Sequence, residues 1–324
     1  MFIAPRQVGL QLVLLFTILS GARLHAADTA QADALLQQGK VDQASALLQS
    51  ALTAQPNDAL AHYLLCRVNY AQDLADAAIH ECEEAATYAP NDSDTRLWLG
   101  RAYGLKASHV NAFSAFGLAK KVRSSFERAV QLGPANVHAM NDLGEFYIAA
   151  PGIVGGGIDK AQALAARMQS RFPSQSHRML ALIAEKKKDI ATAEAEFKAA
   201  AATGKTPEAY VDLGHFYQRQ NQPDKVLEPL QTAIDLDHRK GPALVDAASI
   251  LTAAHRSPQL AESALREYLT SSARSDSAPA FKVHVQLGDL LARRGDHAGA
   301  RREYAAALAL ASHYEPARKD LQGH

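Results

Sequence analysis

Four side chains in the first third of the chain could form a covalent bond or hold a metal ion: His62, Cys66, His80 and Cys82. His62 and Cys66 are four residues apart, and residues at that spacing share one face of a helix. A second helix that returns after a turn near residue 74 would bring Cys82 level with Cys66. Three interpretations stay open: two small core residues, a disulfide, or a zinc site, which needs four ligands in tetrahedral geometry. His80 is expected to point away from the other three, which disfavours zinc.

The common catalytic motifs are absent from the sequence. It contains no His-Glu-x-x-His, no Gly-x-Ser-x-Gly and no complete Walker loop. The glycine-rich stretch Pro151–Gly157 lacks the Gly-Lys-Ser/Thr ending of a phosphate loop, so we interpret it as a lengthened turn. Arg294-Gly295-Asp296 is also interpreted as a turn. We therefore predict no catalytic residue, no metal, no cofactor and no enzyme activity.

The composition is typical of a folded protein built from close-packed helices. Of the 324 residues, 48% are hydrophobic and only 6% are aromatic, so the core must consist mostly of small side chains. Lys and Arg number 34 and Asp and Glu number 34, which gives a net charge of 0. A surface without excess positive charge is a poor match for a phosphate backbone. Nucleic acid is therefore not expected as a partner.

Residues 1–26 have the order of a secretory signal peptide. Arg6 precedes an apolar stretch, and small residues lead to Ala26. The uncharged interval after Arg6 has 16 residues, fewer than the roughly 20 that a membrane-spanning helix requires. We expect cleavage, a mature chain without a transmembrane segment, and a periplasmic or secreted location; an uncleaved N-terminal anchor is the alternative. In an oxidising compartment, a disulfide between Cys66 and Cys82 becomes the favoured interpretation.

The rest of the chain repeats with a period near 34 residues. Pro56 and Pro90 are 34 residues apart, and so are Pro173 and Pro207. Periods between 20 and 50 residues indicate stacked supersecondary units. A second marker, a Leu-Gly pair with a large side chain three residues after the glycine, occurs at Leu99-Gly100, Leu143-Gly144, Leu213-Gly214 and Leu287-Gly288.

A third marker puts small and large residues on one helical face, because they are spaced by four and three. It occurs at Ala44/Leu48/Ala51, Ala78/Cys82/Ala85, Ala193/Phe197/Ala200 and Ala300/Tyr304/Ala307. Together the markers resemble the tetratricopeptide repeat, in which Leu-Gly and Tyr belong to the first helix of a hairpin and Ala, Phe and Ala to the second. The resemblance covers residues 29–321 and implies an all-α fold, an α-α superhelix.

The resemblance implies a solenoid of about eight helical hairpins over residues 27–324. The expected units are a partial one at 29–56, followed by 59–90, 93–134, 137–173, 174–206, 207–238, 241–277 and 281–312. A final helix near Tyr314–Leu321 would cover the last exposed face. Hairpins in such an array contact mainly their neighbours, so a disturbance in the last unit should leave the first units protected.

In this repeat family, first-helix residues form a concave groove, which implies a partner-binding face here. The matching positions are Tyr63, Arg67, Tyr70, Arg101, Asn141, Glu145, His215 and Arg219. Arg67 and Arg101 are 34 residues apart, so we expect their guanidinium groups side by side, where they could grip a carboxylate or an acidic peptide. The family's carboxylate clamp of Lys and Asn is not reproduced. The alternative is a solvated helix face without a ligand.

Two insertions create a second candidate surface. Extra residues lengthen the inter-helix segments near 104–122 and 150–158, which should lie on the same edge and touch. Loops that carry function often stand on a rigid scaffold in this way. The residues expected at this partner-binding edge are Phe113, Phe116, Ile153 and Val154. The alternative is that the two phenylalanines only pack on the loop Pro151–Gly157.

These features predict an exported scaffold that binds a peptide or protein partner, in the groove or on the inserted edge. Envelope assembly and secretion are the processes in which such a scaffold would act. The alternative function is a solenoid that binds a small molecule or a metal ion. Its site would lie at the inserted edge or at His62, Cys66 and Cys82.

Overall fold

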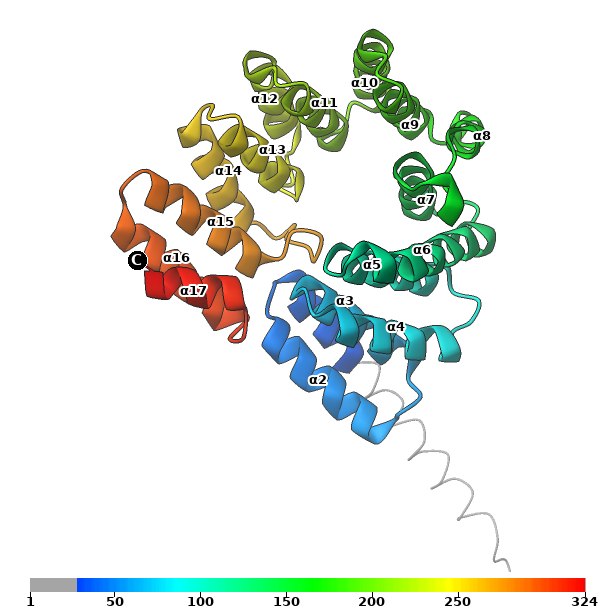
Figure 1. The fold of residues 1–324 in the computed structure, drawn as a ribbon. Helices are drawn as coiled ribbons and strands as arrows, with labels where there is room; N and C mark the ends of the chain where they lie inside the picture. The colour runs from blue at the N-terminus through cyan, green and yellow to red at the C-terminus, as the bar shows by residue number, and fades with distance from the viewer. Residues whose placement is uncertain (1–27, 324) are drawn as a thin grey trace, which may run out of the picture.

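The computed structural model describes residues 28–323, and it shows antiparallel helical hairpins stacked side by side (Figure 1). The first helices of the hairpins are residues 28–37, α3 (Ala59–Ala71), α5 (Ser93–Ser108), α7 (Val137–Ala149), α9 (Pro173–Lys186), α11 (Pro207–Arg219), α13 (Ala243–Ala253) and α15 (Ala280–Arg293). The second helices are α2 (Val41–Ala54), α4 (Ala75–Tyr88), α6 (Ala112–Leu132), α8 (Ile158–Met168), α10 (Ile190–Gly204), α12 (Leu227–Leu236), α14 (Pro258–Thr270) and α16 (His297–Leu310).

Helix α17 (Glu315–Gly323) follows the last hairpin, and the 3-10 turns η1 (Gly152–Val154) and η2 (Pro223–Lys225) interrupt two inter-helix connections. Residues 28–323 contain no strand, which confirms the predicted all-α superhelix. The first unit, expected to be partial, instead forms a hairpin of residues 28–37 and α2. The signal peptide predicted at 1–26 lies outside the described residues.

Short polar side chains and prolines begin many of these helices. The Asp58 carboxylate accepts hydrogen bonds from the backbone N–H groups of Leu60 and Ala61 at the start of α3, at 2.9 and 3.2 Å. Pro173 and Pro207 occupy the first positions of α9 and α11, where the missing N–H has no helical partner to lose. The helix boundaries therefore follow from local chemistry that repeats from unit to unit.

The glycines of the Leu-Gly marker mark close approaches between helices. A Cβ atom on Gly214 would lie 2.5 Å from Leu230, and one on Gly288 would lie 2.5 Å from the Tyr304 ring, in each case on the second helix of the same hairpin. Gly144 differs, because Met179 on the first helix of the next hairpin fills the space beside it. The glycine and the large residue of the repeat are thus two sides of one contact.

We expect Gly288→Leu to lower the free energy of unfolding by about 1–3 kcal/mol, because the fully buried Tyr304 leaves no room for a larger side chain. Urea denaturation monitored by circular dichroism measures this change. Gly104→Leu is the matched control, since Gly104 also lies in a first helix but a Cβ atom there would meet no packed neighbour within 4 Å. Equal stability of the two variants would show that the register assigned to this marker is wrong.

The tyrosines that follow three of the Leu-Gly pairs join their hairpins to the preceding ones. The Tyr147 hydroxyl donates a hydrogen bond to Glu127 on α6 at 3.0 Å, and the Tyr217 hydroxyl donates one to Glu194 on α10 at 2.9 Å. Burial, with the Glu127 hydrogen bond and charge, raises the pKa of Tyr147 to about 12. These phenols therefore stay protonated and act as donors throughout the physiological pH range.

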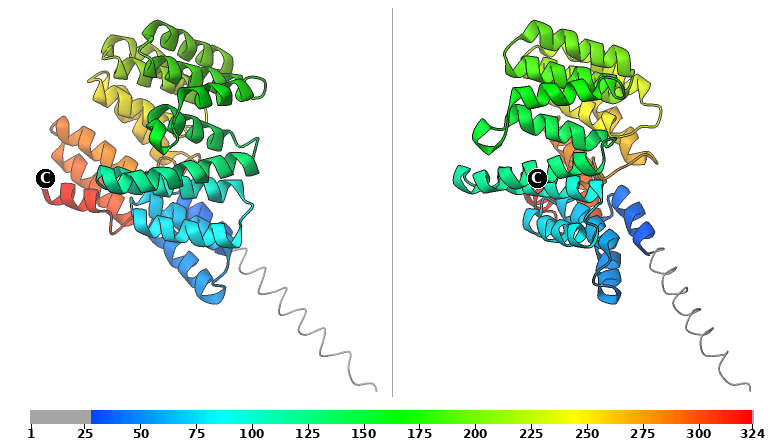
Figure 2. Two further views of the ribbon diagram at one scale, coloured as in Figure 1. Left: turned by 45° about the vertical axis from the view of Figure 1, so that its right-hand side comes forward. Right: turned by 90° about the vertical axis from the view of Figure 1, so that its right-hand side faces the viewer.

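The array curves until its two ends meet, so the molecule is a closed ring (Figures 1 and 2). Gly39 packs on Ala280, where a Cβ on the glycine would lie 2.8 Å from the Ala280 nitrogen. The Ser312 N–H donates a hydrogen bond to the Asp42 carboxylate at 2.8 Å. An ion pair between Lys282 and Asp73, also 2.8 Å, connects α15 to the end of α3.

An apolar cluster makes this closure part of the core. Phe281 and Ala317 are fully buried in one cluster with Leu36 and Leu64 from the first two hairpins. The expectation that hairpins contact mainly their neighbours is therefore wrong for the ends of this array. Helix α17 packs on α16, as expected of a helix that covers the last hairpin, and its buried Ala317 belongs to the same cluster.

The first insertion lengthens helices rather than a loop. Helix α5 continues to Ser108 and α6 begins at Ala112, so only three residues remain in the turn between them. The Asn111 side chain accepts a hydrogen bond from the Ser114 N–H at 3.0 Å and starts α6 early. The long inter-helix segment expected near 104–122 is therefore mostly helical, whereas the second insertion forms η1.

Candidate partner-binding site

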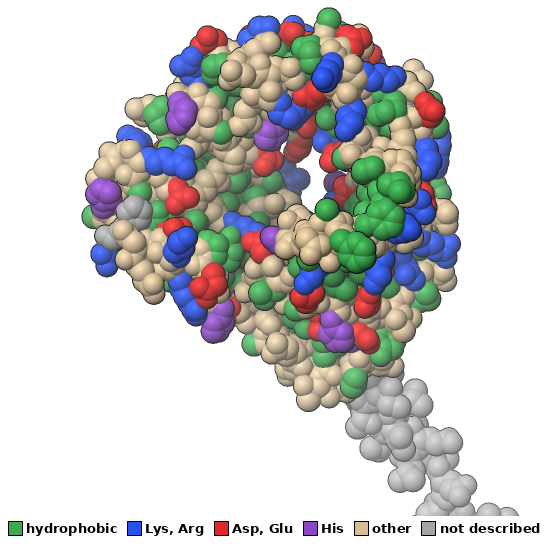
Figure 3. Space-filling model, in the orientation of Figure 1, with side chains coloured by type: hydrophobic (Ala, Val, Ile, Leu, Met, Phe, Trp, Pro, Cys, Tyr) green, Lys and Arg blue, Asp and Glu red, His purple; other side chains and the backbone are tan. Residues whose placement is uncertain are grey.

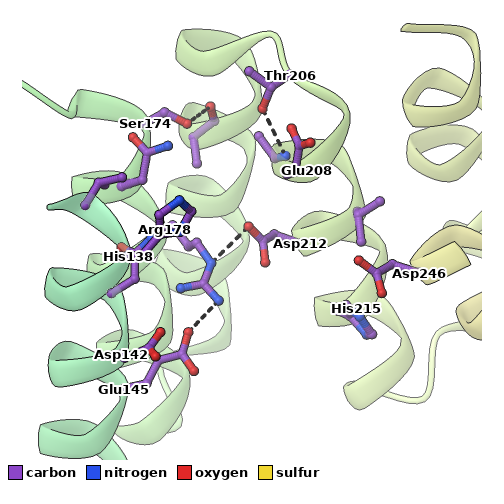
Figure 4. Close-up of a pocket in the computed structure, with 16 residues that line it drawn as sticks. His138, Asp142, Glu145, Ser174, Arg178, Thr206, Glu208, Asp212, His215 and Asp246 are labelled. Atoms are coloured by element: carbon purple, nitrogen blue, oxygen red, sulfur yellow. Dashed lines mark hydrogen bonds and ion pairs between the residues drawn. The ribbon is translucent and has the colours of Figure 1, made fainter. Parts of the chain in front are cut away.

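The first helices face the inside of the ring (Figure 1), and the space-filling view shows an opening at its centre (Figure 3). On one side of this opening lies a hollow of about 600 Å³, which we call the central hollow. Four successive first helices, α7, α9, α11 and α13, contribute most of its residues (Figure 4). The polar and charged residues that line it are His138, Asn141, Asp142, Glu145, Ser174, Gln175, Arg178, Thr206, Glu208, Asp212, His215 and Asp246.

Arg178 bridges two carboxylates on neighbouring helices. Its Nη2 atom lies 2.7 Å from Glu145 on α7, and its Nε atom lies 2.9 Å from Asp212 on α11. Burial alone would lower the pKa of Arg178, but these two carboxylates outweigh that effect and raise it. The guanidinium is therefore permanently charged and holds three consecutive hairpins at a fixed spacing.

The charge of the central hollow is strongly negative. Five of its residues are carboxylates and one is an arginine, and Arg101 from outside the hollow pairs with one of the five, Asp142. Five negative charges against two positive charges leave −3, with the histidines left out of the count. Asp246 projects into the hollow from α13 (Figure 4). Desolvation raises the pKa of Asp246, the carboxylates of Asp212 and Glu208 raise it further, and His215 opposes them. A cationic group placed here would offset this repulsion.

Three of the predicted groove residues line the central hollow: Asn141, Glu145 and His215. The His215 Nδ1 atom lies 3.3 Å from Gln218 Oε1 on the next turn of α11. Arg219 is not among the residues of the hollow; its Nη2 atom pairs with Glu185 at 2.8 Å. Arg178, Asp212 and Asp246 were not predicted from the sequence.

The other predicted groove residues gather around Trp98, and we call this second set the N-terminal groove. The Cζ atoms of Arg67 and Arg101 lie 5.5 and 4.9 Å from the centre of the Trp98 ring. Tyr70 meets the same ring edge-on at 5.3 Å, and the Arg67 Cζ lies 5.3 Å from the centre of the Tyr63 ring. Arg67 and Arg101 therefore lie next to each other, against the same indole ring.

Both arginines already have carboxylate partners from this chain. The Nε atom of Arg101 lies 2.7 Å from Asp142. Arg67 contacts Asp276 through Nε at 2.8 Å and Asp33 through Nη1 at 3.3 Å. The expectation of two cations free to grip an acidic peptide is therefore wrong for the ring as it stands, because their charges are neutralised within the molecule.

The inserted edge is partly exposed and partly buried. The side chains of Phe113 and Ile153 are 92% and 77% exposed, and Phe116 is also exposed. Phe113 therefore does not pack on the loop Pro151–Gly157, and that alternative is wrong. Val154 is buried, so it cannot contact a partner, and its carbonyl oxygen accepts a hydrogen bond from Arg123 on α6 at 3.3 Å.

Cys66, Cys82 and His62 already have bonding partners within the chain. Cys66 and Cys82 form a disulfide, with 5.2 Å between their Cα atoms. The ring nitrogens of His62 contact Glu81 and the Pro56 carbonyl oxygen, at 2.7 and 2.9 Å. Sulfur atoms joined in a disulfide are not thiolate ligands, so the alternative of a metal site here is wrong for the oxidised chain.

Comparison with known proteins agrees with this architecture. Residues 29–94 match the tetratricopeptide repeat family model, and the Leu-Gly glycines of later hairpins make the close contacts described above. Residues 29–94 are therefore similar to the tetratricopeptide repeat, and the later hairpins continue the same stacked architecture. No curated protein sequence matches it.

The similar solved structures are distant in sequence. Yeast Tom70 is 16% identical with a TM-score of 0.51, over 87% of this chain and 57% of that one. A tetratricopeptide-repeat protein of Thermus thermophilus is 19% identical with a TM-score of 0.48, over 70% of this chain and 99% of that one. At such identities the likeness to Tom70 concerns the fold alone. Among residues 28–323, no helix combines the length and the apolar character needed to cross a membrane.

Proposed function

We propose that this protein is an exported scaffold that holds a positively charged, extended segment of a protein partner in the central hollow. The fold supports a role in protein interaction, and the observation that carries the finer proposal is the charge of the hollow. Arg178 neutralises part of the negative charge, while Glu208 and Asp246 face the same space. An extended segment with Lys or Arg side chains would supply the missing cations.

The location in this proposal rests on the sequence of residues 1–26 and on the cysteine pair. A signal peptide would deliver the chain to a compartment where thiols oxidise, and Cys66 and Cys82 are placed to form a disulfide there. In such a compartment the scaffold would serve envelope assembly or secretion, in which chains pass between membranes before they fold. A ring that holds a basic segment of such a chain would keep it from other contacts.

Site-specific crosslinking in the exporting cell tests this proposal. A photo-crosslinking amino acid at His138, which lies in the hollow, should yield adducts, whereas the same amino acid at Arg302, an exposed position on α16, should not. Mass spectrometry of the adducts should identify a segment rich in Lys or Arg. Because screening weakens exposed charge pairs, the adduct yield should fall as the salt concentration rises.

Charge removal provides the matched variants. Glu208→Gln with Asp246→Asn should reduce the adduct yield at His138 about tenfold, the loss expected when a bound cation forfeits roughly 1.4 kcal/mol. Asp224→Asn, an exposed carboxylate outside the central hollow, should leave the yield unchanged. Adducts that form equally at His138 and Arg302, or that do not respond to Glu208 and Asp246, would contradict the proposal.

A further inference from the structure

An unusually long connection before α15 bridges the closure of the ring. Nine residues, 271–279, lie between the end of α14 at Thr270 and the start of α15 at Ala280. By contrast, only residues 89–92 separate α4 from α5. Figure 1 shows this connection extending toward α3 and α5, on the far side of the closure. We call residues 271–279 the crossing loop.

The crossing loop has an ordered shape of its own. The Tyr268 hydroxyl donates a hydrogen bond to the Ala278 carbonyl oxygen at 2.6 Å and accepts one from the Ser275 N–H at 2.9 Å. The Ser275 and Ser277 hydroxyls lie 2.6 Å apart, so they bond to each other. These contacts present the side chain between the two serines, Asp276, to α3 on the other side of the closure.

Asp276 docks in the N-terminal groove as a ligand would. Its carboxylate accepts a hydrogen bond from Arg67 Nε at 2.8 Å, and its N–H donates one to Gln37 Oε1 at 3.2 Å. The side chains of Asp276 and Arg67 are only 10% and 12% exposed, so the pair is largely removed from water. Burial alone would lower the pKa of Arg67, but the hydrogen bond and charge of Asp276 outweigh it and raise the pKa.

The docked part of the loop is held by few apolar contacts. Residues 271–277 are exposed or half-buried, and burial resumes only at Ala278. Segments with few buried apolar contacts open locally at low free-energy cost, so breaking the pair between Asp276 and Arg67 is the main cost of moving the loop. The packing of Ala280 on Gly39 and the pair between Lys282 and Asp73 lie beyond the loop, so the ring can stay closed while the loop moves out.

We propose that the crossing loop is a built-in ligand that covers a second partner-binding surface, and that this surface takes an extended peptide segment carrying an aspartate or glutamate. A partner's carboxylate would replace Asp276 on Arg67, and its backbone N–H would replace that of Asp276 on Gln37. The Trp98 ring and Tyr63 would form the flat walls beside the segment. Only protein molecules whose crossing loop is displaced can bind the segment. The apparent affinity is therefore the intrinsic affinity multiplied by the fraction of molecules in that state.

Trp98 is the only tryptophan in the chain, and its place beside Arg67 makes its fluorescence a direct reporter of the N-terminal groove. The probe is a synthetic peptide with the sequence of residues 270–279, and its control carries asparagine in place of the aspartate. Asp276→Ala should bind the aspartate peptide at least tenfold more tightly than the unmodified protein does, and should not bind the asparagine peptide. Adding Arg67→Met to Asp276→Ala should abolish binding.

Asp224→Ala is the matched control, because it also removes an aspartate paired with an arginine, Arg256, but on an exposed turn away from the groove. It should bind no more peptide than the unmodified protein. If Asp276→Ala fails to fold, Gln37→Ala provides a second variant, because it loosens the docked loop without removing a charge. It should also increase the affinity for the aspartate peptide, by a smaller factor. The proposal is overturned if neither variant gains affinity, or if the two peptides bind alike.

Discussion

Replacing Phe281 by Ala is expected to lower the free energy of unfolding by about 3–5 kcal/mol, the range for deleting a large buried aromatic side chain. Phe281 is fully buried where the two ends of the ring meet, and its ring lies 4.9 Å from that of Tyr314. Because its cluster includes Leu36 and Leu64, the loss is shared by the first hairpins as well as the last.

Amide hydrogen exchange distinguishes this from a local defect. Exchange should accelerate both in residues 28–71 and in residues 280–321, while α9 and α10 on the opposite side of the ring stay protected. Phe113→Ala is the control, because the same substitution at a side chain that is 92% exposed should change stability by no more than about 0.5 kcal/mol. Acceleration restricted to the C-terminal helices would contradict the shared core.

Loss of the disulfide is expected to destabilise the oxidised protein by about 3 kcal/mol, because the bond between Cys66 and Cys82 closes a short loop and restricts the unfolded chain. Chemical denaturation with and without dithiothreitol measures the difference. The double variant Cys66→Ala, Cys82→Ala should resemble the reduced protein and should no longer respond to the reductant.

Thiol titration provides the companion measurement for this prediction. Protein purified from the exported fraction and unfolded without reductant should show no free thiol, since Cys66 and Cys82 are the only cysteines in the chain. Two titratable thiols per molecule, or a denaturation midpoint that ignores dithiothreitol, would mean that the pair stays reduced in its compartment.

The hairpins could be predicted from the sequence because the contacts that define them are short in range. Gly288 and Tyr304 belong to one hairpin, and they recur as a small residue and a large one at a regular spacing. The cysteine pair could be placed for the same reason, since 16 residues separate its members. Both residues of each of these contacts lie within one repeat, so the sequence of that repeat is enough to predict the contact.

The closure of the ring could not be predicted in this way. It depends on the sum of small rotations between successive hairpins, to which every interface contributes. Arg67 meets Asp276, which is 209 residues away, and no motif connects the two positions. From the sequence alone, Arg67 is therefore expected to be free to bind another molecule. In the structure it is paired with Asp276 of the same chain.

Some of the site was within reach of the sequence. Arg178 and Asp212 are 34 residues apart, which places them at equivalent positions on adjacent first helices, where opposite charges attract. The early start of α6 also had a local signal, because Asn111 is a favourable residue at the start of a helix. The exposure of Phe113 had no such local signal, because no sequence pattern indicates that the lengthened helix extends beyond its neighbours.

Because its ends meet, the number of units in this array is set by geometry. An open solenoid gains or loses a hairpin at little cost beyond one interface, whereas here an added hairpin would push Ala280 away from Gly39 and a deleted one would leave the circumference too short. We therefore expect duplication or deletion of a whole hairpin to break the contacts at the closure. The width of the central opening is consequently fixed by the number of hairpins that close the ring.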